Sequence, residues 1–147
     1  MIKEEEQRES IKKSVKVTSA YMLQLFRHPV GTTAEFNPSF LLMAENLDEA
    51  PATLRTGGGY LRHTRQLMQE VGVDISNVAD LPSKPVDGRT FDGMGLDMHT
   101  PGGSVHQEYY STVAEGYALS VILSFATPDQ QDSLHQIFDQ LHFKPAE

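Results

Sequence analysis

Hydrophobic residues occur along this chain in short runs, and turn-forming residues separate the runs. Two segments, SAYMLQLFRH (19–28) and SFLLMAEN (39–46), carry apolar side chains at both odd and even positions. Because successive side chains of a strand point to opposite faces, such strands are typical of a sheet that is covered on both faces. The pattern therefore predicts a central sheet between helices, at least over these two strands.

In the segment RTGGGYLRHTRQLMQEVGV (55–73) the apolar residues recur every three to four positions, which is the period of a helix. Thr56 is placed to cap the start of this helix, and Gly72 is placed to end it. The three glycines 57–59 could present backbone amide groups to an anion, or they could form a flexible entry to the helix. The spacing predicts one apolar stripe, which consists of Tyr60, Leu61, Thr64, Leu67, Met68 and Val71.

A second helix is predicted near the end of the printed sequence. Thr127 suits the N-cap, Pro128 suits the first helical position, and Gln130 suits the reciprocal position of a capping box. The apolar stripe of this helix, which we expect to pack against the sheet, consists of Leu134, Ile137, Phe138 and Leu141.

Three strands are predicted between the two helices. The segments RTFDGMGLDMHT (89–100), SVHQEYYSTV (104–113) and YALSVILSF (117–125) are separated by the turns PGG and AEG, which indicates an antiparallel meander. Residues 74–88 are polar and contain two prolines, so we expect a surface connection that ends in a short edge strand.

Together these elements predict an α+β fold. We expect an α-β-α sandwich around a mainly antiparallel sheet of about five to six strands. The sandwich should form one domain over residues 18–147, and a charged, partly exposed helix should precede it over residues 1–17.

The composition restricts the chemistry. The chain has 147 residues, with 12 Lys and Arg against 20 Asp and Glu, a net charge of −8 and no cysteine. The lack of cysteine excludes disulfides, thiolate metal sites and cysteine nucleophiles. The excess of carboxylates would repel the phosphate groups of nucleic acids, so we expect no nucleic acid partner.

No segment suggests a membrane span or a secretory address. The longest apolar runs, FLLMA and YALSVILSFA, are far shorter than the roughly 20 residues that span a bilayer. The start, MIKEEEQRESIKKSVK, lacks the apolar core of a signal peptide. As written, the chain is expected to be cytoplasmic, and the cell envelope is the alternative if a signal precedes this start.

The stretch DMHTPGGSVHQEYY (97–110) is the main candidate for chemistry. Alternation along the two strands places Asp97, His99, His106 and Glu108 on one face of the hairpin. A two-residue loop would place Asp97 opposite His106, whereas a four-residue loop would place His99 opposite His106. Two imidazoles and two carboxylates could hold zinc or another divalent ion. The alternative interpretation is a polar face that meets water, because alternation alone predicts polar residues there.

No catalytic set is apparent. The sequence has no G-x-S-x-G elbow, and the isolated residues His63, His135 and His142 are expected at the surface or at the border of an apolar stripe. We therefore expect a noncatalytic protein without a cofactor. The alternative is a small metal- or ligand-binding protein that uses the polar face of the 97–108 hairpin, with hydrolysis as the boldest form of this hypothesis.

The order of the elements resembles that of the PsbP-like superfamily, which includes the extrinsic PsbP protein of photosystem II, Ran-binding Mog proteins and many bacterial domains. The stretches that carry the resemblance are FNPSFLLMAENL, GGYLRHTRQLMQEVG and EYYSTVAEGYALSVILSF, followed by a helix that closes on LHF. The likeness covers residues 19–143. It implies an α-β-α sandwich that serves mostly as a binding or assembly module, and it supplies no catalytic residues.

The chain departs from this superfamily at its start. Members begin with a short strand pair and a Pro-Gly-Trp-like turn, whereas this chain begins with a charged segment and has no tryptophan. Either the N-terminal strand pair is missing, or the start of the sequence as written is too late. A missing strand pair would leave an unpaired sheet edge, which predicts a homodimer or a swapped arrangement. The leading hypothesis is a noncatalytic interaction module of a bacterial cell with an unknown protein partner.

Overall fold

The computed structural model describes residues 19–29, 31 and 36–143 of the chain. Over these residues one sheet of six strands runs in the order β1-β2-β6-β5-β4-β3, and every neighbouring pair is antiparallel. The helix predicted over residues 1–17 lies outside the described residues. The strands are β1 Ser19–Phe26, β2 Ser39–Asn46, β3 Ile75–Val86, β4 Arg89–Thr100, β5 Gly103–Ala114 and β6 Tyr117–Phe125.

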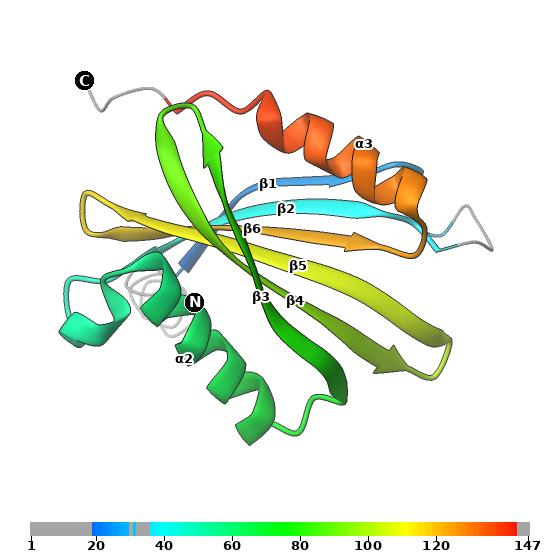
Figure 1. Cartoon of the computed structure of the whole chain (residues 1–147), viewed down its shortest axis with the longest axis horizontal. Coiled ribbons are helices and arrows are strands. Elements are labelled where there is room, and N and C mark those ends of the chain that lie inside the picture. The colour runs from blue at the N-terminus through cyan, green and yellow to red at the C-terminus, as the bar shows by residue number, and fades with distance from the viewer. Residues whose placement is uncertain (1–18, 30, 32–35, 144–147) are drawn as a thin grey trace, which may run out of the picture.

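Two helices, α2 (Gly57–Glu70) and α3 (Pro128–Asp139), cover opposite faces of the twisted sheet (Figure 1). A short 3-10 helix, Ala52–Leu54, precedes α2. Two successive tyrosines of β5 point to opposite faces of the sheet. Tyr109 packs in a cluster with residues of α2, and Tyr110 packs with residues of α3. The predicted α-β-α sandwich around an antiparallel sheet is therefore confirmed. No helix in the described ranges is long and apolar enough to cross a membrane.

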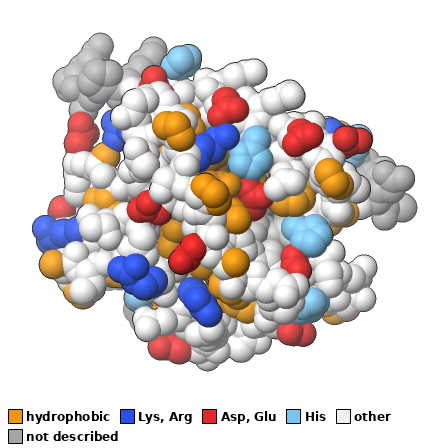
Figure 2. Space-filling model, viewed as in Figure 1, with side chains coloured by type: hydrophobic (Ala, Val, Ile, Leu, Met, Phe, Trp, Pro, Cys, Tyr) orange, Lys and Arg blue, Asp and Glu red, His pale blue; other side chains and the backbone are white. Residues whose placement is uncertain are grey.

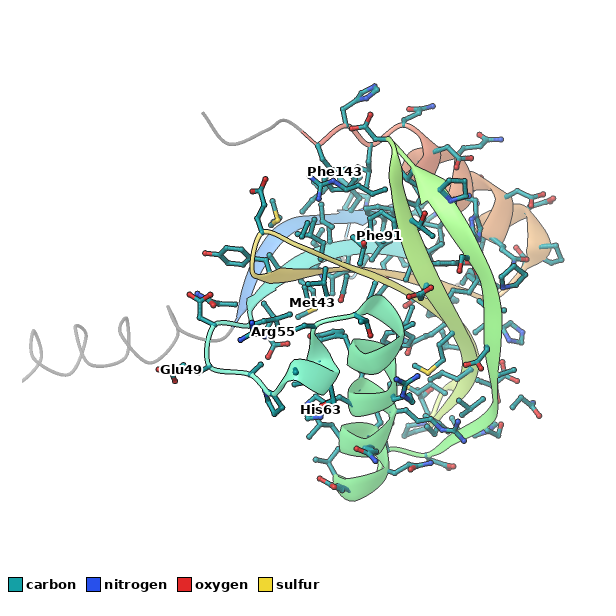
Figure 3. The ribbon with its side chains drawn as sticks, turned by 60° about the vertical axis from the view of Figure 1, so that its left-hand side comes forward. Met43, Glu49, Arg55, His63, Phe91 and Phe143 are labelled. Carbon is teal, nitrogen blue, oxygen red and sulfur yellow. The ribbon has the colours of Figure 1, made fainter. Side chains whose placement is uncertain are left out.

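The larger part of the core lies between the sheet and α3. Phe138 of α3 is fully buried, and its ring meets those of Phe91, Tyr110 and Phe40 edge-on at centroid distances of 5.2, 5.3 and 6.3 Å. Figure 3 shows Phe91 and Phe143 near one another on this side of the molecule, and their ring centroids are 5.9 Å apart. Edge-on aromatic pairs add to the free energy gained by burying apolar area, so this cluster fixes α3 on the sheet.

The core on the side of α2 is smaller and contains a buried phenol. The hydroxyl group of Tyr60 donates a hydrogen bond to the carboxylate of Glu45 in β2. Burial and this neighbouring carboxylate raise the pKa of Tyr60 well above its usual range, so the phenol stays protonated as the donor. The other buried members of the hydrophobic clusters on this side are Leu47, Leu61, Met94, Leu96, Tyr109 and Ala118.

The stretch predicted to be a surface connection forms a full strand instead. β3 extends over 12 residues and contains Pro82 and Pro85. Proline lacks a backbone N–H donor, but β3 is an edge strand, where one side of the backbone needs no partner. The next two residues, Asp87 and Gly88, both have positive φ (50° and 76°) and form the tight turn that joins β3 to β4. An Asp-Gly pair is a sequence signal for a hairpin turn, but the two prolines before it favoured a surface connection in the prediction.

The expectation that both early strands are covered on both faces is wrong for β1. In β2, Phe40 and Leu42 are buried. In β1, by contrast, Met22, Leu25 and Phe26 are 58%, 40% and 41% exposed. Leu23 packs against the core cluster, whereas Met22, Leu25 and Phe26 are largely left out of it.

Two of the three glycines at the start of α2, Gly57 and Gly59, serve close packing. A methyl group on Gly57 would lie 2.2 Å from the backbone oxygen of Ser111, and one on Gly59 would lie 1.9 Å from that of Thr53. A methyl group on Gly58 would have the guanidinium of Arg62, at 3.6 Å, as its nearest neighbour. Gly57 and Gly59 thus let the helix start approach the backbone of β5 and of the 3-10 helix.

This geometry predicts opposite effects for two neighbouring substitutions. Gly58→Ala should raise the free energy of unfolding by about 0.5–1 kcal/mol, because alanine loses less backbone entropy in a helix. Gly57→Ala should lower it by about 1–3 kcal/mol, because the methyl group would overpack the contact with Ser111. Urea unfolding of both variants checks this pair, and a similar change in both would contradict the close approach.

Candidate functional site

A pocket of about 340 Å³ lies between the start of α3 and the sheet face formed by β4 and β5. Its lining includes Asp97 of β4, His106 and Glu108 of β5, and Gln131 of α3. Figure 2 shows histidine and acidic side chains side by side in the right half of the view, whereas most Lys and Arg side chains lie in the left half. The pocket therefore brings together three of the four residues that the sequence singled out.

The β4–β5 hairpin has the shorter of the two predicted loops. Thr100 is opposite Gly103, so Pro101 and Gly102 form a two-residue loop, and Asp97 is opposite His106. His99 is opposite Ser104 and not opposite His106. The register that would have paired the two histidines is thus not the one adopted.

Asp97 forms the open, polar part of the pocket. Its carboxylate accepts hydrogen bonds from the side-chain amide of Asn77 (2.8 Å) and from Nδ1 of His106. These two hydrogen bonds, that from Asn77 first, lower the pKa of Asp97 below its usual value. The imidazole of His106 is half exposed, and its centroid is 5.7 Å from that of the Phe125 ring. Asp97 is therefore ionised at neutral pH and holds His106 in place.

Glu108 forms the inner part of the pocket and is only 6% exposed. Its Oε1 accepts hydrogen bonds from the hydroxyl group of Tyr110 (2.8 Å) and from Nε2 of His135 (2.7 Å). Its Oε2 accepts a hydrogen bond from the side-chain amide of Gln131 (2.7 Å). Burial by itself raises the pKa of Glu108, but the three hydrogen bonds outweigh it and lower the pKa overall. Glu108 is thus a buried, ionised carboxylate that joins α3 to the sheet.

The residues around Glu108 were not predicted as site residues. Alternation correctly placed Glu108 and Tyr110 on one face, but that face was interpreted as the outward side of the meander, and α3 covers this part of it. His135 was expected at the surface or at the border of the apolar stripe, and it lies partly buried, where it donates to Glu108. The available signal was the i, i+4 spacing of Gln131 and His135 beside the apolar stripe of α3.

The four predicted metal ligands fall into three settings. Asp97 and His106 contact one another, and Glu108 lines the same pocket but is held by three other side chains. His99 is bonded through its ring nitrogens to the hydroxyl groups of Ser76 (2.7 Å) and Ser104 (2.8 Å). Within the described part of the chain, no group of three or more His, Asp or Glu residues is arranged to hold a metal ion. A metal site of all four residues stays a prediction.

A second pocket of about 350 Å³ lies between α2 and strands β3 and β4. Arg62 and Arg65 line it together with Gly58, which agrees with the placement of the glycine run near basic residues. However, Asp80 and Asp92 also line it, and their charges oppose an anion there. Figure 3 shows Arg55 in the segment before α2 and His63 on α2 itself. The geometry does not favour the anion-binding interpretation of the glycine run.

Solved structures with the same arrangement of elements are found. Protein PA94 of Pseudomonas aeruginosa, described as a candidate regulator of unknown function, has a TM-score of 0.58 and 11% identity, over 84% of this chain and 85% of that chain. Cyanobacterial PsbP from Synechocystis has a TM-score of 0.43 and 14% identity, over 85% and 84% of the two chains. LpqN of Mycobacterium tuberculosis, involved in cell envelope biogenesis, has a TM-score of 0.42 and 12% identity, over 87% and 84%.

These similarities concern the fold. The TM-score of 0.58 to the Pseudomonas protein, at 11% identity, shows a shared fold and no shared function. No protein-family model matches this chain, and no curated protein matches it. The chemistry of the site therefore has to be argued from the residues themselves.

The role of Glu108 as an ionised tie predicts a specific pH dependence. Glu108→Gln should lower the free energy of unfolding at pH 7 by about 1–3 kcal/mol, because one amide oxygen replaces a carboxylate that serves three donors. The pKa of Glu108 lies below its ordinary value of 4.5, so its contribution is present above that value and is lost as the pH falls through the folded-state pKa. The difference between the two proteins should shrink in acid.

Urea unfolding at several pH values between neutral and acid measures this difference. Glu49→Gln is the matched control, because Glu49 is exposed and its replacement should change stability by less than about 0.5 kcal/mol. A difference that stays constant or grows as the pH falls below 4.5 would contradict an ionised Glu108.

Proposed function

We propose that this protein is a noncatalytic interaction module of a bacterial cell, and that it pairs through the outer edge of β1 with a second copy of itself. The observation that carries the proposal is the exposure of Met22, Leu25 and Phe26 on one edge strand. An edge strand presents unpaired N–H and C=O groups, and exposed apolar side chains beside them favour the addition of another strand.

The opposite edge of the sheet is protected by its sequence. β3 contains Pro82 and Pro85, carries Asp80 and Lys84, and shifts register twice along β4. Prolines, charges and bulges are the means by which edge strands avoid pairing with other chains. β1 has one register shift, at Met22, and no charged residue between positions 19 and 26. The contrast supports β1 as the interaction edge.

Charge limits the part of the surface at which a second copy can pair. The chain has a net charge of −8, so two copies repel one another over most of their surfaces. The uncharged β1 is a segment where two copies can meet without placing like charges opposite one another. An antiparallel pair of β1 strands around a two-fold axis would use the same residues of both copies and would close as a homodimer.

Charged substitutions on β1 should break the dimer. The double variant Met22→Lys/Phe26→Lys places a cation on each side of the proposed pairing region, and both native side chains are exposed, so the fold should persist. Light scattering coupled to gel filtration should give a dimer for the native protein and a monomer for this variant. The physical reason is that paired copies would bring like charges together.

Leu67→Lys provides the matched control, because Leu67 is an exposed apolar residue of α2, at 46%. This variant should remain dimeric. A native protein that is strictly monomeric at high concentration, or a double variant that stays dimeric, would exclude the proposal.

A metal-binding role at the hairpin is the second candidate, and the contact between Asp97 and His106 favours it. Two ligands already together could recruit His99 or Glu108 if a metal ion were supplied, and hydrolysis at such an ion is the boldest form of this hypothesis. Under this hypothesis, calorimetric titration with zinc should show binding that His99→Ala/His106→Ala removes and His28→Ala/His63→Ala retains. A dissociation constant weaker than about 1 mM would exclude this candidate.

A further inference from the structure

We propose that the pocket at the start of α3 binds a small organic ammonium ion with an apolar body. The pocket is built by β3 to β6 and α3, away from the β1 edge at the other side of the sheet, so this inference goes beyond the proposed self-association and does not depend on it. Its volume of about 340 Å³ is at the lower end of the range for small-molecule sites.

The charge of the lining favours a cation. Asp97 and Glu108 both face the pocket, and no Lys or Arg is present among the described residues that line it. The hydrogen-bond donors to these two carboxylates are the neutral groups of Asn77, Gln131 and Tyr110 together with two imidazoles. No permanent cation therefore neutralises the two carboxylates within the pocket, and a bound ammonium group would do so.

Glu108 has capacity for one more donor on the side of α3. Its Oε1 accepts two hydrogen bonds, from Tyr110 and His135, whereas its Oε2 accepts one, from Gln131. A carboxylate oxygen accepts two hydrogen bonds, so Oε2 can accept one from an ammonium N–H. The carboxylate is already held in place by its three donors. Ligand binding would therefore cost little additional side-chain entropy at Glu108.

The apolar part of the lining suits the body of such a ligand. Phe125 of β6, Leu81 of β3 and Pro128 of α3 line the pocket together with Gly95. Gly95 is opposite Glu108 in the β4–β5 pairing, and the side chain of Leu81 packs over it, because a methyl group on Gly95 would lie 3.4 Å from Cδ1 of Leu81. Ligand pockets usually combine apolar walls with a few fixed polar groups, and this pocket has both.

The start of α3 does not turn this pocket into an anion site. A helix start favours anions through its free N–H groups, but Pro128 has none, and the N–H of Gln130 is bonded to the hydroxyl group of Thr127 (3.3 Å). Asp129 in the first turn further offsets the positive end of the helix dipole. Asp97 and Glu108 would also repel an anion, so these carboxylates make the electrostatic potential of the pocket negative.

Binding of benzylammonium tests the inference, with benzyl alcohol and phenylacetate as neutral and anionic probes of the same shape. Chemical-shift changes in ¹H–¹⁵N NMR spectra should map to the pocket, with a dissociation constant on the order of 1 mM for so small a probe. Benzyl alcohol should bind about tenfold more weakly, and phenylacetate should cause no shifts there.

Two variants separate charge from shape. Asp97→Asn should weaken benzylammonium binding about tenfold, whereas Asp80→Asn, with the same change in net charge outside this pocket, should leave it unchanged. Gly95→Val should displace the side chain of Leu81, change the shape of the pocket and weaken binding without changing any charge. The folded state of each variant is visible in the same NMR spectra.

Three results would overturn the inference: no shifts at the pocket with benzylammonium, equal binding of benzyl alcohol, or equal weakening by Asp80→Asn and Asp97→Asn. The Met22→Lys/Phe26→Lys variant should bind benzylammonium as the native protein does. Failure of self-association and failure of ligand binding are therefore distinguishable.

Discussion

The position of α3 depends on one buried carboxylate. An ionised group is costly to bury, and Glu108 is stable under α3 because Tyr110, Gln131 and His135 donate hydrogen bonds to it. Two of these donors belong to the helix, so the helix is held at a fixed position along β5. The aromatic cluster around Phe138 supplies apolar contact one turn further along the helix, but apolar contact alone permits sliding. The hydrogen bonds to Glu108 thus specify where α3 lies along β5.

The pocket follows from that position. α3 begins beside the polar end of the β4–β5 hairpin, and the space between them is closed on one side by Gln131 and on the other by Asp97. Glu108 therefore has two roles, because it ties the helix to the sheet and contributes the inner charge of the pocket. The sheet edge at β1 lies outside this arrangement, which is why binding of a small ligand and self-association can be separate properties of one fold.

Much of the fold could be predicted from the sequence. Thr56 and Thr127 marked the helix starts, and both hydroxyl groups accept the predicted capping hydrogen bonds. Gly72, with φ of 77°, follows the end of α2 as expected. β3 was expected only as a short edge strand at the end of a surface connection, and its full length was missed because an edge strand tolerates prolines that would exclude a central strand. Local patterns predict such elements well because caps and turns depend on neighbouring residues.

The site was harder to predict, because its geometry depends on contacts between distant segments. Alternation placed Asp97, His99, His106 and Glu108 on one face and left two loop lengths open, of which the two-residue loop is adopted. It did not indicate that α3 covers Glu108 and leaves Asp97 at the pocket mouth. That distinction comes from Gln131 and His135, which lie 23 and 27 residues away along the chain. Period-two patterns define faces of a strand, and only packing decides which part of a face is buried.

The most direct test of this account is the pKa of Glu108 itself, measured by NMR titration of its side-chain carboxyl carbon in the folded protein. If three donors hold the buried carboxylate ionised under α3, the pKa lies below its ordinary value of 4.5. A pKa above that value would show that burial outweighs the hydrogen bonds, and it would contradict both the tie between α3 and the sheet and the negative charge of the inner pocket.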